Sequence, residues 1–178
     1  LVCHCSPTLA GLKTGSLFSC PYSSQKMIIK EIREFNQKLT QKGIRIIPVR
    51  ISDKRMLVYV YRPEKLKEDF SDEKTQIILK CKGYDCTNLS QCICRLIQKL
   101  QSDPDFPHEI GLFLGYPAED VKGFIENKAA CSKCSGCWKV YGDEQAARIL
   151  FKKYKKCTEI YCRRWKSGVA VEQLTITI

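Results

Sequence analysis

The sequence lacks the short motifs that identify most nucleotide-binding and hydrolytic enzymes. It contains no G-x-G-x-x-G fingerprint, no P-loop, no G-x-S-x-G elbow and no H-E-x-x-H zinc motif. Internal repeats and low-complexity tracts are also absent. No reaction class follows from a motif, so whether the chain is an enzyme is left open at this stage.

Long apolar runs are missing as well. No run approaches the roughly 18 residues that a membrane-spanning helix needs, and no charged-then-apolar signal segment is visible. We therefore expect no membrane span. Leu1 is not a translation start, so an upstream piece can be missing.

Acidic residues are scarce relative to basic ones, with 19 against 30 and a formal net charge of +11. Such an excess favours anionic partners such as nucleic acid, phosphorylated cofactors or acidic proteins. The plainer interpretation is a soluble protein with basic outer helix faces. At 178 residues, with 44% hydrophobic and 28% charged residues, the chain is predicted to be a single globular domain over residues 1–178.

Cysteine is present in excess, with 12 residues. A disulfide framework, metal or cluster ligands, and reduced thiols are the competing interpretations. Disulfide-dense secreted domains are usually small and rich in loops, whereas this sequence has several long amphipathic helical patterns. We therefore expect reduced cysteines and a cytoplasmic location.

The periodicity of apolar residues predicts an α+β fold. A hairpin is predicted over residues 44–61, with an edge or bulge at Pro48, and residues 169–178 alternate as a closing strand. Residues 1–20 read as a loop or short strand, and residues 103–107 as a proline-bounded linker. We expect a small, mostly antiparallel sheet packed against several amphipathic helices. Helices are predicted over residues 25–42, 63–70, 72–82, 88–101 and 143–166. Two more are predicted between residues 106 and 130, the first ended by Gly115 and the second begun by Pro117.

The strongest chemical signal is the C-x2-C-x2-C run of Cys131, Cys134 and Cys137. Two-residue spacers let successive thiolates converge on one zinc ion or iron–sulfur cluster. A ferredoxin-type run would place a fourth cysteine at position 141, which is Tyr141, so a remote ligand is needed. The candidates are Cys3, Cys5, Cys157 and Cys162, of which we favour Cys3 or Cys157. The alternative is an exposed loop with reduced thiols.

A second group near the start of the chain comprises His4, Cys5 and Lys13. A cysteine beside a histidine can form a thiolate–imidazolium pair, and a nearby lysine lowers the pKa of a thiol further. These three residues are therefore candidate catalytic residues. The alternative is a terminal turn that packs its apolar residues on the sheet.

His108 and Glu109 are candidate cofactor-binding residues. Because the chain has only two histidines, His4 and His108 are candidates for a pair of metal ligands or an acid–base pair across a cleft. The alternative places His108 near a helix N-terminus, where Glu109 interacts with the helix dipole.

The last predicted helix carries many lysines and arginines interleaved with aromatic residues, a pattern found in nucleic-acid-binding proteins. Phe151, Tyr154, Tyr161 and Trp165 are expected on its buried side, where they cannot stack on bases. Nucleic-acid binding is therefore a minor alternative.

Three segments of the chain together resemble a family of bacterial proteins known chiefly as a domain of unknown function. They are HCSPTLAGLK, PHEIGLFLGYPAEDVKGFIEN and GCWKVYGDEQAARILF, and the resemblance runs from about His4 to the C-terminus. It implies a compact bacterial domain of the kind found in anaerobic, mostly Gram-positive bacteria, and it transfers no activity, cofactor or catalytic residue. It also implies a redox or iron context, with a flavodoxin-like electron carrier as a partner.

Taken together, these features predict a metal- or iron–sulfur-binding protein with a thiol or redox role. One alternative is a cofactor-free cysteine-dependent enzyme that uses Cys5, His4 and Lys13. The other is a basic binding module for nucleic acid or an acidic protein.

Overall fold

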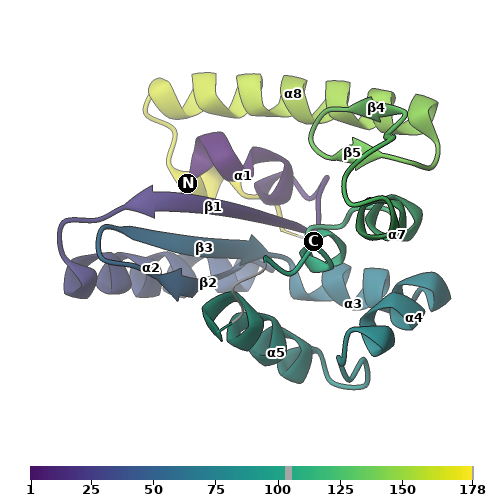
Figure 1. The fold of residues 1–178 in the computed structure, drawn as a ribbon. Helices are drawn as coiled ribbons and strands as arrows, with labels where there is room; N and C mark the ends of the chain where they lie inside the picture. The colour runs from purple at the N-terminus through teal and green to yellow at the C-terminus, as the bar shows by residue number, and fades with distance from the viewer. Residues whose placement is uncertain (103–105, 178) are drawn as a thin grey trace. The chain divides into compact units, whose positions relative to one another are not determined.

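The computed structural model describes residues 1–102 and 106–177, and it has the predicted α+β class (Figure 1). Part of the predicted linker and the last residue of the predicted closing strand, residues 103–105 and 178, lie outside the described residues. Within the described ranges, no helix is long and apolar enough to cross a membrane.

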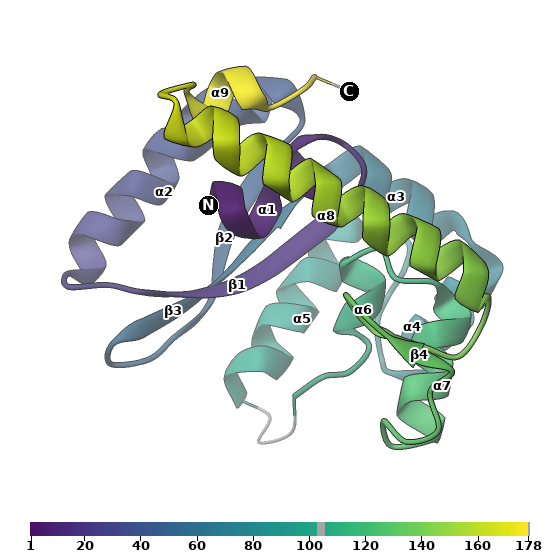
Figure 2. The ribbon, with the colours of Figure 1, turned by 90° about the horizontal axis from the view of Figure 1, so that it is seen from above.

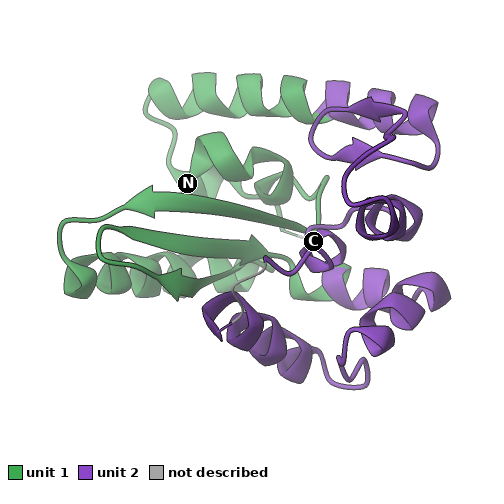
Figure 3. Ribbon diagram, in the orientation of Figure 1, with its two compact units in different colours: residues 1–65, 154–178 green, residues 66–153 purple. Residues whose placement is uncertain are grey.

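The chain divides into two compact units (Figure 3). The first consists of Leu1–Lys65 and Tyr154–Ile178, and the second of Leu66–Lys153. The single domain over residues 1–178 stays a prediction.

The first unit is built on an antiparallel sheet of three strands in the order β1–β3–β2. The hairpin predicted over residues 44–61 is confirmed, and so is the irregularity at Pro48. This proline lies on the edge strand, where the register shifts between Pro48 and Arg50, because proline has no N–H to donate to a neighbouring strand. The strands are β1, Gly15–Pro21, β2, Arg45–Ile51, and β3, Arg55–Tyr61.

Two helices, α1, Val2–Leu9, and α2, Gln25–Leu39, share one core with the sheet. Ser24 begins α2 by accepting a hydrogen bond from the Met27 N–H at 3.5 Å, and a short 3-10 turn, η1, Thr40–Lys42, follows it. Alternate residues of β3 face this core, as a half-buried strand requires. The core consists of Val2, Cys5, Leu9, Ile32, Leu39, Ile44, Ile46, Met56, Val58, Val60 and Leu174.

The prediction of a loop or short strand for residues 1–20 is wrong in its first half, which forms α1. Pro7 lies inside this helix and cannot donate a backbone hydrogen bond. The helix tolerates it because it is short and buries Val2, Cys5 and Leu9 in the core. The Ser6 hydroxyl also donates to the Val2 carbonyl at 2.7 Å. Burial therefore outweighs the helix-breaking tendency of proline here.

The predicted closing strand is also wrong, because the only regular element described after Gly168 is a short helix, α9, Val171–Leu174. The backbone of this C-terminal segment bonds to a helix end and to charged side chains instead of a strand. The Ile176 N–H donates to the Leu9 carbonyl at 3.2 Å, and Lys42 Nζ donates to the Thr175 carbonyl at 3.0 Å.

Arg62 joins three segments of the first unit, and its side chain is buried. Its Nε and Nη2 donate to the carbonyls of Thr8 and Leu9, each at 2.7 Å. Nη1 donates to the Lys42 carbonyl at 3.0 Å, and Nη2 also donates to the Ile176 carbonyl at 2.9 Å. One guanidinium therefore satisfies the carbonyls that end α1 and η1 and one carbonyl of the C-terminal segment.

The second unit is mainly helical and contains most of the helices predicted between residues 63 and 126. Asp72 begins α4 by accepting the Thr75 N–H at 2.9 Å. Ile77 is 56% exposed, because Thr75 and Leu79 form the buried side of α4. Helix α3 (Pro63–Ser71) starts in the first unit and continues into the second. The other elements are the helices α4 (Glu73–Cys81), α5 (Leu89–Ser102), α6 (Ile110–Phe113) and α7 (Ala118–Glu126), and the short strands β4 (Cys134–Ser135) and β5 (Lys139–Val140).

The long basic helix, α8, Glu144–Lys166, contributes residues up to Lys153 to the second unit and those from Tyr154 to the first. Tyr154 is buried as predicted, and its hydroxyl donates to the Leu12 carbonyl at 3.3 Å. The prediction for Trp165 is wrong, since this side chain is 47% exposed. It lies in the last turn of α8, after Tyr161 and Cys162, which still pack against the core.

Candidate functional site

The predicted catalytic residues His4 and Cys5 both lie on α1, but their side chains have different surroundings. His4 is exposed and stacks on Phe18, with 5.1 Å between the ring centroids. Cys5 is buried in the core, and burial raises the pKa of its thiol to about 12, although Lys13 and a hydrogen bond with Ser16 act to lower it. At neutral pH the Cys5 thiol is therefore protonated, and a catalytic role for these residues stays a prediction.

A different cysteine of α1 meets a partner. Cys162 Sγ in α8 donates a hydrogen bond to Cys3 Sγ in α1 across 3.2 Å. Both residues belong to the first unit, and two views show α1 beside the C-terminal half of α8 (Figures 1 and 2). Cys3 is exposed and Cys162 half-buried, so both sulfur atoms lie near solvent.

The two thiols are not equivalent. Burial raises the pKa of Cys162, and the hydrogen bond and charge of Cys3 raise it further, while Lys166 acts to lower it. Cys162 is therefore the thiol that keeps its proton and donates it to the Cys3 sulfur. A disulfide has an S–S distance of about 2.05 Å, so the two sulfur atoms, now 3.2 Å apart, need to approach each other by about 1 Å to form one.

The C-x2-C-x2-C run leads into a small hairpin of the second unit and ends in its turn. Cys134 begins β4, and Cys137 lies in the exposed turn before β5. Cys131 is exposed and has a left-handed backbone with φ of 58°. In the parts of the chain that the structure describes, no three or more His, Cys, Asp or Glu residues are grouped so that they could hold a metal ion.

The two favoured fourth ligands, Cys3 and Cys157, belong to the first unit and not to the unit that carries the hairpin. Zinc or iron–sulfur binding by the hairpin therefore stays a prediction. The thiolates of such a loop can be brought together by the metal itself, since metal binding and local folding are coupled.

Glu109 forms a buried ion pair. Its Oε1 accepts hydrogen bonds from Lys99 Nζ at 2.7 Å and from the Tyr84 hydroxyl at 3.1 Å. Lys99 also donates to the Lys82 carbonyl at 2.7 Å and lies 4.5 Å from the centre of the Tyr84 ring. The Glu109 carboxylate therefore joins α5 to the start of α6, and its predicted cofactor-binding role stays a prediction.

This ion pair predicts a loss of stability in acid. Burial acts to raise the pKa of Glu109, but hydrogen bonds from Lys99 and its own backbone, the Lys99 charge and Tyr84 leave the pKa below its ordinary value of 4.5. The stabilisation is therefore complete above pH 4.5 and is lost as the pH falls through the lower, folded-state pKa.

The measurement is the free energy of unfolding of the wild type and of Glu109→Gln at a series of pH values. The difference between the two proteins should be constant near neutrality and should shrink in acid. A difference that grows as the pH falls would contradict the assignment.

His108 and Cys137, from two different motifs, line the same cavity of about 450 Å³. We call this cavity the aromatic pocket. Gly111 allows α6 and α7 to approach closely at its wall, because a Cβ at this position would lie 2.7 Å from Val121 Cγ2. The pocket is lined by Phe106, His108, Ile110, Gly111, Leu114, Tyr116, Asp120, Val121, Phe124, Ser135, Cys137, Trp138 and Lys139.

Asp120 holds one wall of the aromatic pocket in place. Its Oδ2 accepts the Trp138 indole N–H at 2.7 Å. Its Oδ1 accepts the backbone N–H groups of Tyr141 and Gly142, each at 2.7 Å. The Trp138 ring is further fixed between Tyr116, stacked at 4.7 Å, and Phe151, edge-on at 4.6 Å.

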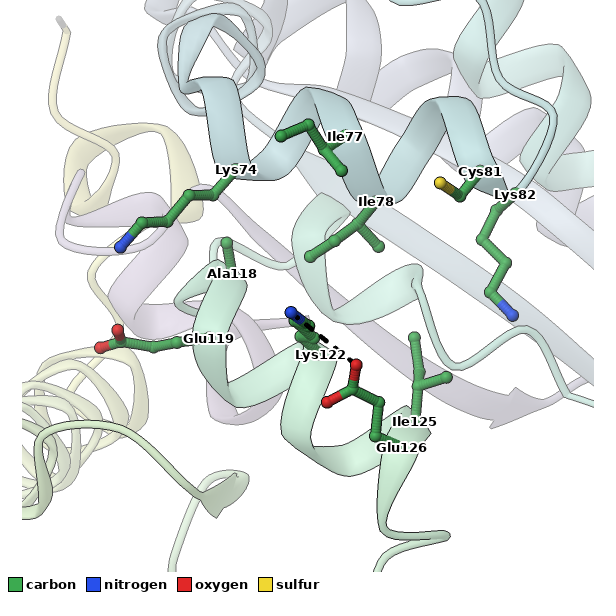
Figure 4. A pocket seen from close by; sticks show the side chains of 10 residues that line it. All are labelled: Lys74, Ile77, Ile78, Cys81, Lys82, Ala118, Glu119, Lys122, Ile125 and Glu126. Atoms are coloured by element: carbon green, nitrogen blue, oxygen red, sulfur yellow. Dashed lines mark ion pairs between the residues drawn. The ribbon is translucent and has the colours of Figure 1, made fainter.

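A second cavity of about 440 Å³ lies between α4 and α7 (Figure 4). Ile77, Ile78 and Ile125 give it an apolar surface, and charged side chains surround them. The ion pair between Lys122 and Glu126, at 3.8 Å, is part of this rim. We call this cavity the α4–α7 groove.

The exposed end of α8 removes one argument against nucleic-acid binding. Trp165 was expected to be buried, yet it is exposed beside Arg163, Arg164 and Lys166, which are also exposed. A single exposed aromatic ring among cations is compatible with stacking on a base. Nucleic-acid binding therefore stays a minor prediction.

No local sequence pattern indicates the Cys3–Cys162 pair, because the two residues are 159 positions apart. Both were considered only as remote metal ligands. The aromatic pocket was likewise missed, although all of its lining lies between Phe106 and Lys139, within the stretch that carries two of the family-like motifs.

The comparisons with known proteins add a family but no activity. A family model described as "Protein of unknown function (DUF3793)" matches residues 1–175. No curated protein and no solved structure matches the chain.

Proposed function

Because the chain belongs to this family of unknown function, DUF3793, we propose a function from its own residues: a thiol–disulfide redox protein whose reactive pair is Cys3 and Cys162. The observation that carries the proposal is the hydrogen-bonded contact of their sulfur atoms at 3.2 Å. Of the three other cysteines of the first unit, Cys5 and Cys157 are buried thiols whose pKa is raised by burial, and Cys20 is half-buried.

The two cysteines have distinct tasks in the proposed exchange. The Cys3 thiolate attacks a small disulfide, whose S–S bond breaks, so that one half leaves as a thiolate and the other is joined to Cys3. Cys162 then loses its proton to solvent and attacks the Cys3 sulfur, which releases the second half as a thiolate. The products are a Cys3–Cys162 disulfide and two reduced small thiols, so two electrons pass from the protein to the small disulfide.

The assignment of Cys3 as the attacking sulfur rests on exposure and hydrogen bonding. Cys3 is exposed and accepts the thiol proton of Cys162, which is the more buried of the two. The thiolate is the nucleophile in such reactions and needs access to the incoming disulfide. Lys166 acts to lower the pKa of the Cys162 thiol, which helps this thiol to lose its proton in the second step.

The experiment uses oxidised glutathione as the small disulfide. We expect the reduced Cys162→Ser variant to accumulate a mixed disulfide between glutathione and Cys3, because no second thiol resolves it. The wild type should instead form the internal disulfide and retain less than about one tenth of that adduct, since a neighbouring thiol reacts intramolecularly. Mass spectrometry of proteolytic peptides measures both species.

Cys94→Ser is the matched control, because Cys94 is another exposed cysteine. It should behave as the wild type does. The proposal fails if Cys162→Ser carries no more glutathione on Cys3 than the wild type does. It also fails if the Cys3→Ser variant still forms an internal disulfide at the wild-type rate.

The predicted electron partner, a flavodoxin-like carrier, and the predicted zinc or iron–sulfur group belong to the same redox context. They concern residues other than the proposed pair and are separate hypotheses. Elemental analysis of protein purified without oxygen tests the metal without affecting the thiol experiment.

A further inference from the structure

We propose that the aromatic pocket of the second unit binds a planar aromatic small molecule that carries an anionic group. This site is independent of the thiol pair, which lies in the other unit. The rings that line the pocket, its basic side chains and its fixed wall support this proposal.

The lining matches a flat aromatic ligand. Four aromatic side chains, those of Phe106, Tyr116, Phe124 and Trp138, contribute to it together with Ile110, Leu114 and Val121. Aromatic rings pair favourably when stacked with an offset or edge-on. The volume of about 450 Å³ lies within the range of roughly 300–1,000 Å³ for small-molecule sites.

The polar lining favours an anion. Lys139 and His108 are the basic residues of the pocket. Lys139 Nζ donates one hydrogen bond to the Ala129 carbonyl at 2.6 Å, whereas an ammonium group has three donors. Asp120, the one acidic residue of the lining, already accepts three N–H groups, so its charge is compensated within the protein.

Contacts within the protein hold the wall in place. Asp120 fixes the Trp138 indole and the backbone after β5, and His108 lies edge-on to Phe124 with 5.0 Å between the rings. Binding to a pre-formed wall avoids the entropic cost of ordering it. The rings therefore offer a rigid surface to a planar molecule.

The test uses two fluorescent dyes that differ in one charged group. Anilinonaphthalene sulfonate is aromatic and anionic, and phenylnaphthylamine is its neutral counterpart. We expect the sulfonate to bind more tightly to the chain, with energy transfer from Trp138 in a Trp165→Phe background. Because the chain has two tryptophans, Trp138 is then the only tryptophan that can transfer excitation energy to the dye.

Lys139→Met is expected to weaken binding of the sulfonate about tenfold and to change binding of the neutral dye by less than about twofold, because only the charge-assisted hydrogen bond is lost. Lys133→Met is the matched control. Lys133 is a lysine of the same hairpin that donates to a backbone carbonyl, that of Gly142 at 2.6 Å, and it does not line the pocket.

Ser135→Phe should weaken both dyes, because it fills part of the pocket, whereas Ser132→Phe should not. The proposal is overturned if neither dye binds, or if Lys133→Met weakens the sulfonate as much as Lys139→Met does. It is also overturned if Ile78→Glu, in the α4–α7 groove, abolishes binding while Ser135→Phe does not, because the dye then occupies that groove.

Discussion

Replacing Glu109 by glutamine should lower the free energy of unfolding by about 3–5 kcal/mol, because it leaves the buried Lys99 ammonium without its anion. The side chains of Lys99 and Glu109 are only 15% and 5% exposed, so water cannot readily replace the lost charge. The amide oxygen of glutamine can still accept the hydrogen bond of the Tyr84 hydroxyl. The loss of unfolding free energy therefore reports mainly the missing charge.

The measurement is urea-induced unfolding followed by Trp138 fluorescence in a Trp165→Phe background. Glu126→Gln is the matched control in the same unit, because the Lys122–Glu126 pair is more than 60% exposed on both sides. An exposed pair of this kind contributes about 0–1 kcal/mol. Equal losses in the two variants would show that the Glu109 pair is not stabilised by burial.

Replacing Arg62 by methionine should lower the free energy of unfolding by about 3 kcal/mol. The change keeps most of the buried aliphatic volume but removes the donors that serve the carbonyls of Thr8, Leu9, Lys42 and Ile176. The Leu9 carbonyl keeps the Ile176 N–H and the Thr8 carbonyl keeps the Gly11 N–H. The cost of a buried carbonyl that loses its donor therefore falls mainly on Lys42 and Ile176, which lie in two separate segments.

Arg45→Met provides the comparison for Arg62. Arg45 is an exposed arginine of β2 whose Nη1 donates to Thr40 Oγ1 at 2.8 Å. We expect this variant to lose no more than about 0.5 kcal/mol, as is usual for surface substitutions. Urea unfolding followed by circular dichroism measures both variants. A loss at Arg62 as small as that at Arg45 would mean that water serves the four carbonyls equally well.

The main helices and the central hairpin could be predicted from the sequence because their signals are local. Apolar residues recur at helical spacing along α2, and Ser24 caps the start of this helix. Gly43, with φ of 74°, ends the turn that follows it. Pro48 marked the edge strand correctly for the same reason: a residue without an N–H is restricted to few positions in a sheet.

The two ends of the chain could not be predicted in this way because their conformation depends on distant partners. Residues 2–9 are helical despite Pro7 because they contribute to a core shared with β3 and α2. Residues 169–177 alternate like a strand, yet Lys42, Leu9 and Arg62 bind their backbone. Local pattern and tertiary contact disagree at these places, and tertiary contact determines the fold.

The candidate sites likewise combine features with a local sequence signal and features that depend on tertiary contacts. Sequence spacing identified Cys131, Cys134, Cys137, His108 and Glu109 as chemically notable. It could not reveal that the Glu109 carboxylate pairs with Lys99, or that His108 and Cys137 line one cavity. Nor could it indicate that Cys3 meets Cys162, since only the packing of α1 on α8 brings these thiols together.

The most direct measurement of the central proposal is the identity of the first disulfide that forms in the native wild-type chain. The reduced protein is titrated with oxidised glutathione without denaturant, and each disulfide is mapped by mass spectrometry as it appears. The account predicts that the first disulfide joins Cys3 to Cys162, ahead of any other among the 12 cysteines. A first disulfide within the hairpin, between Cys131 and Cys134 for example, with Cys3 and Cys162 still reduced, would contradict it.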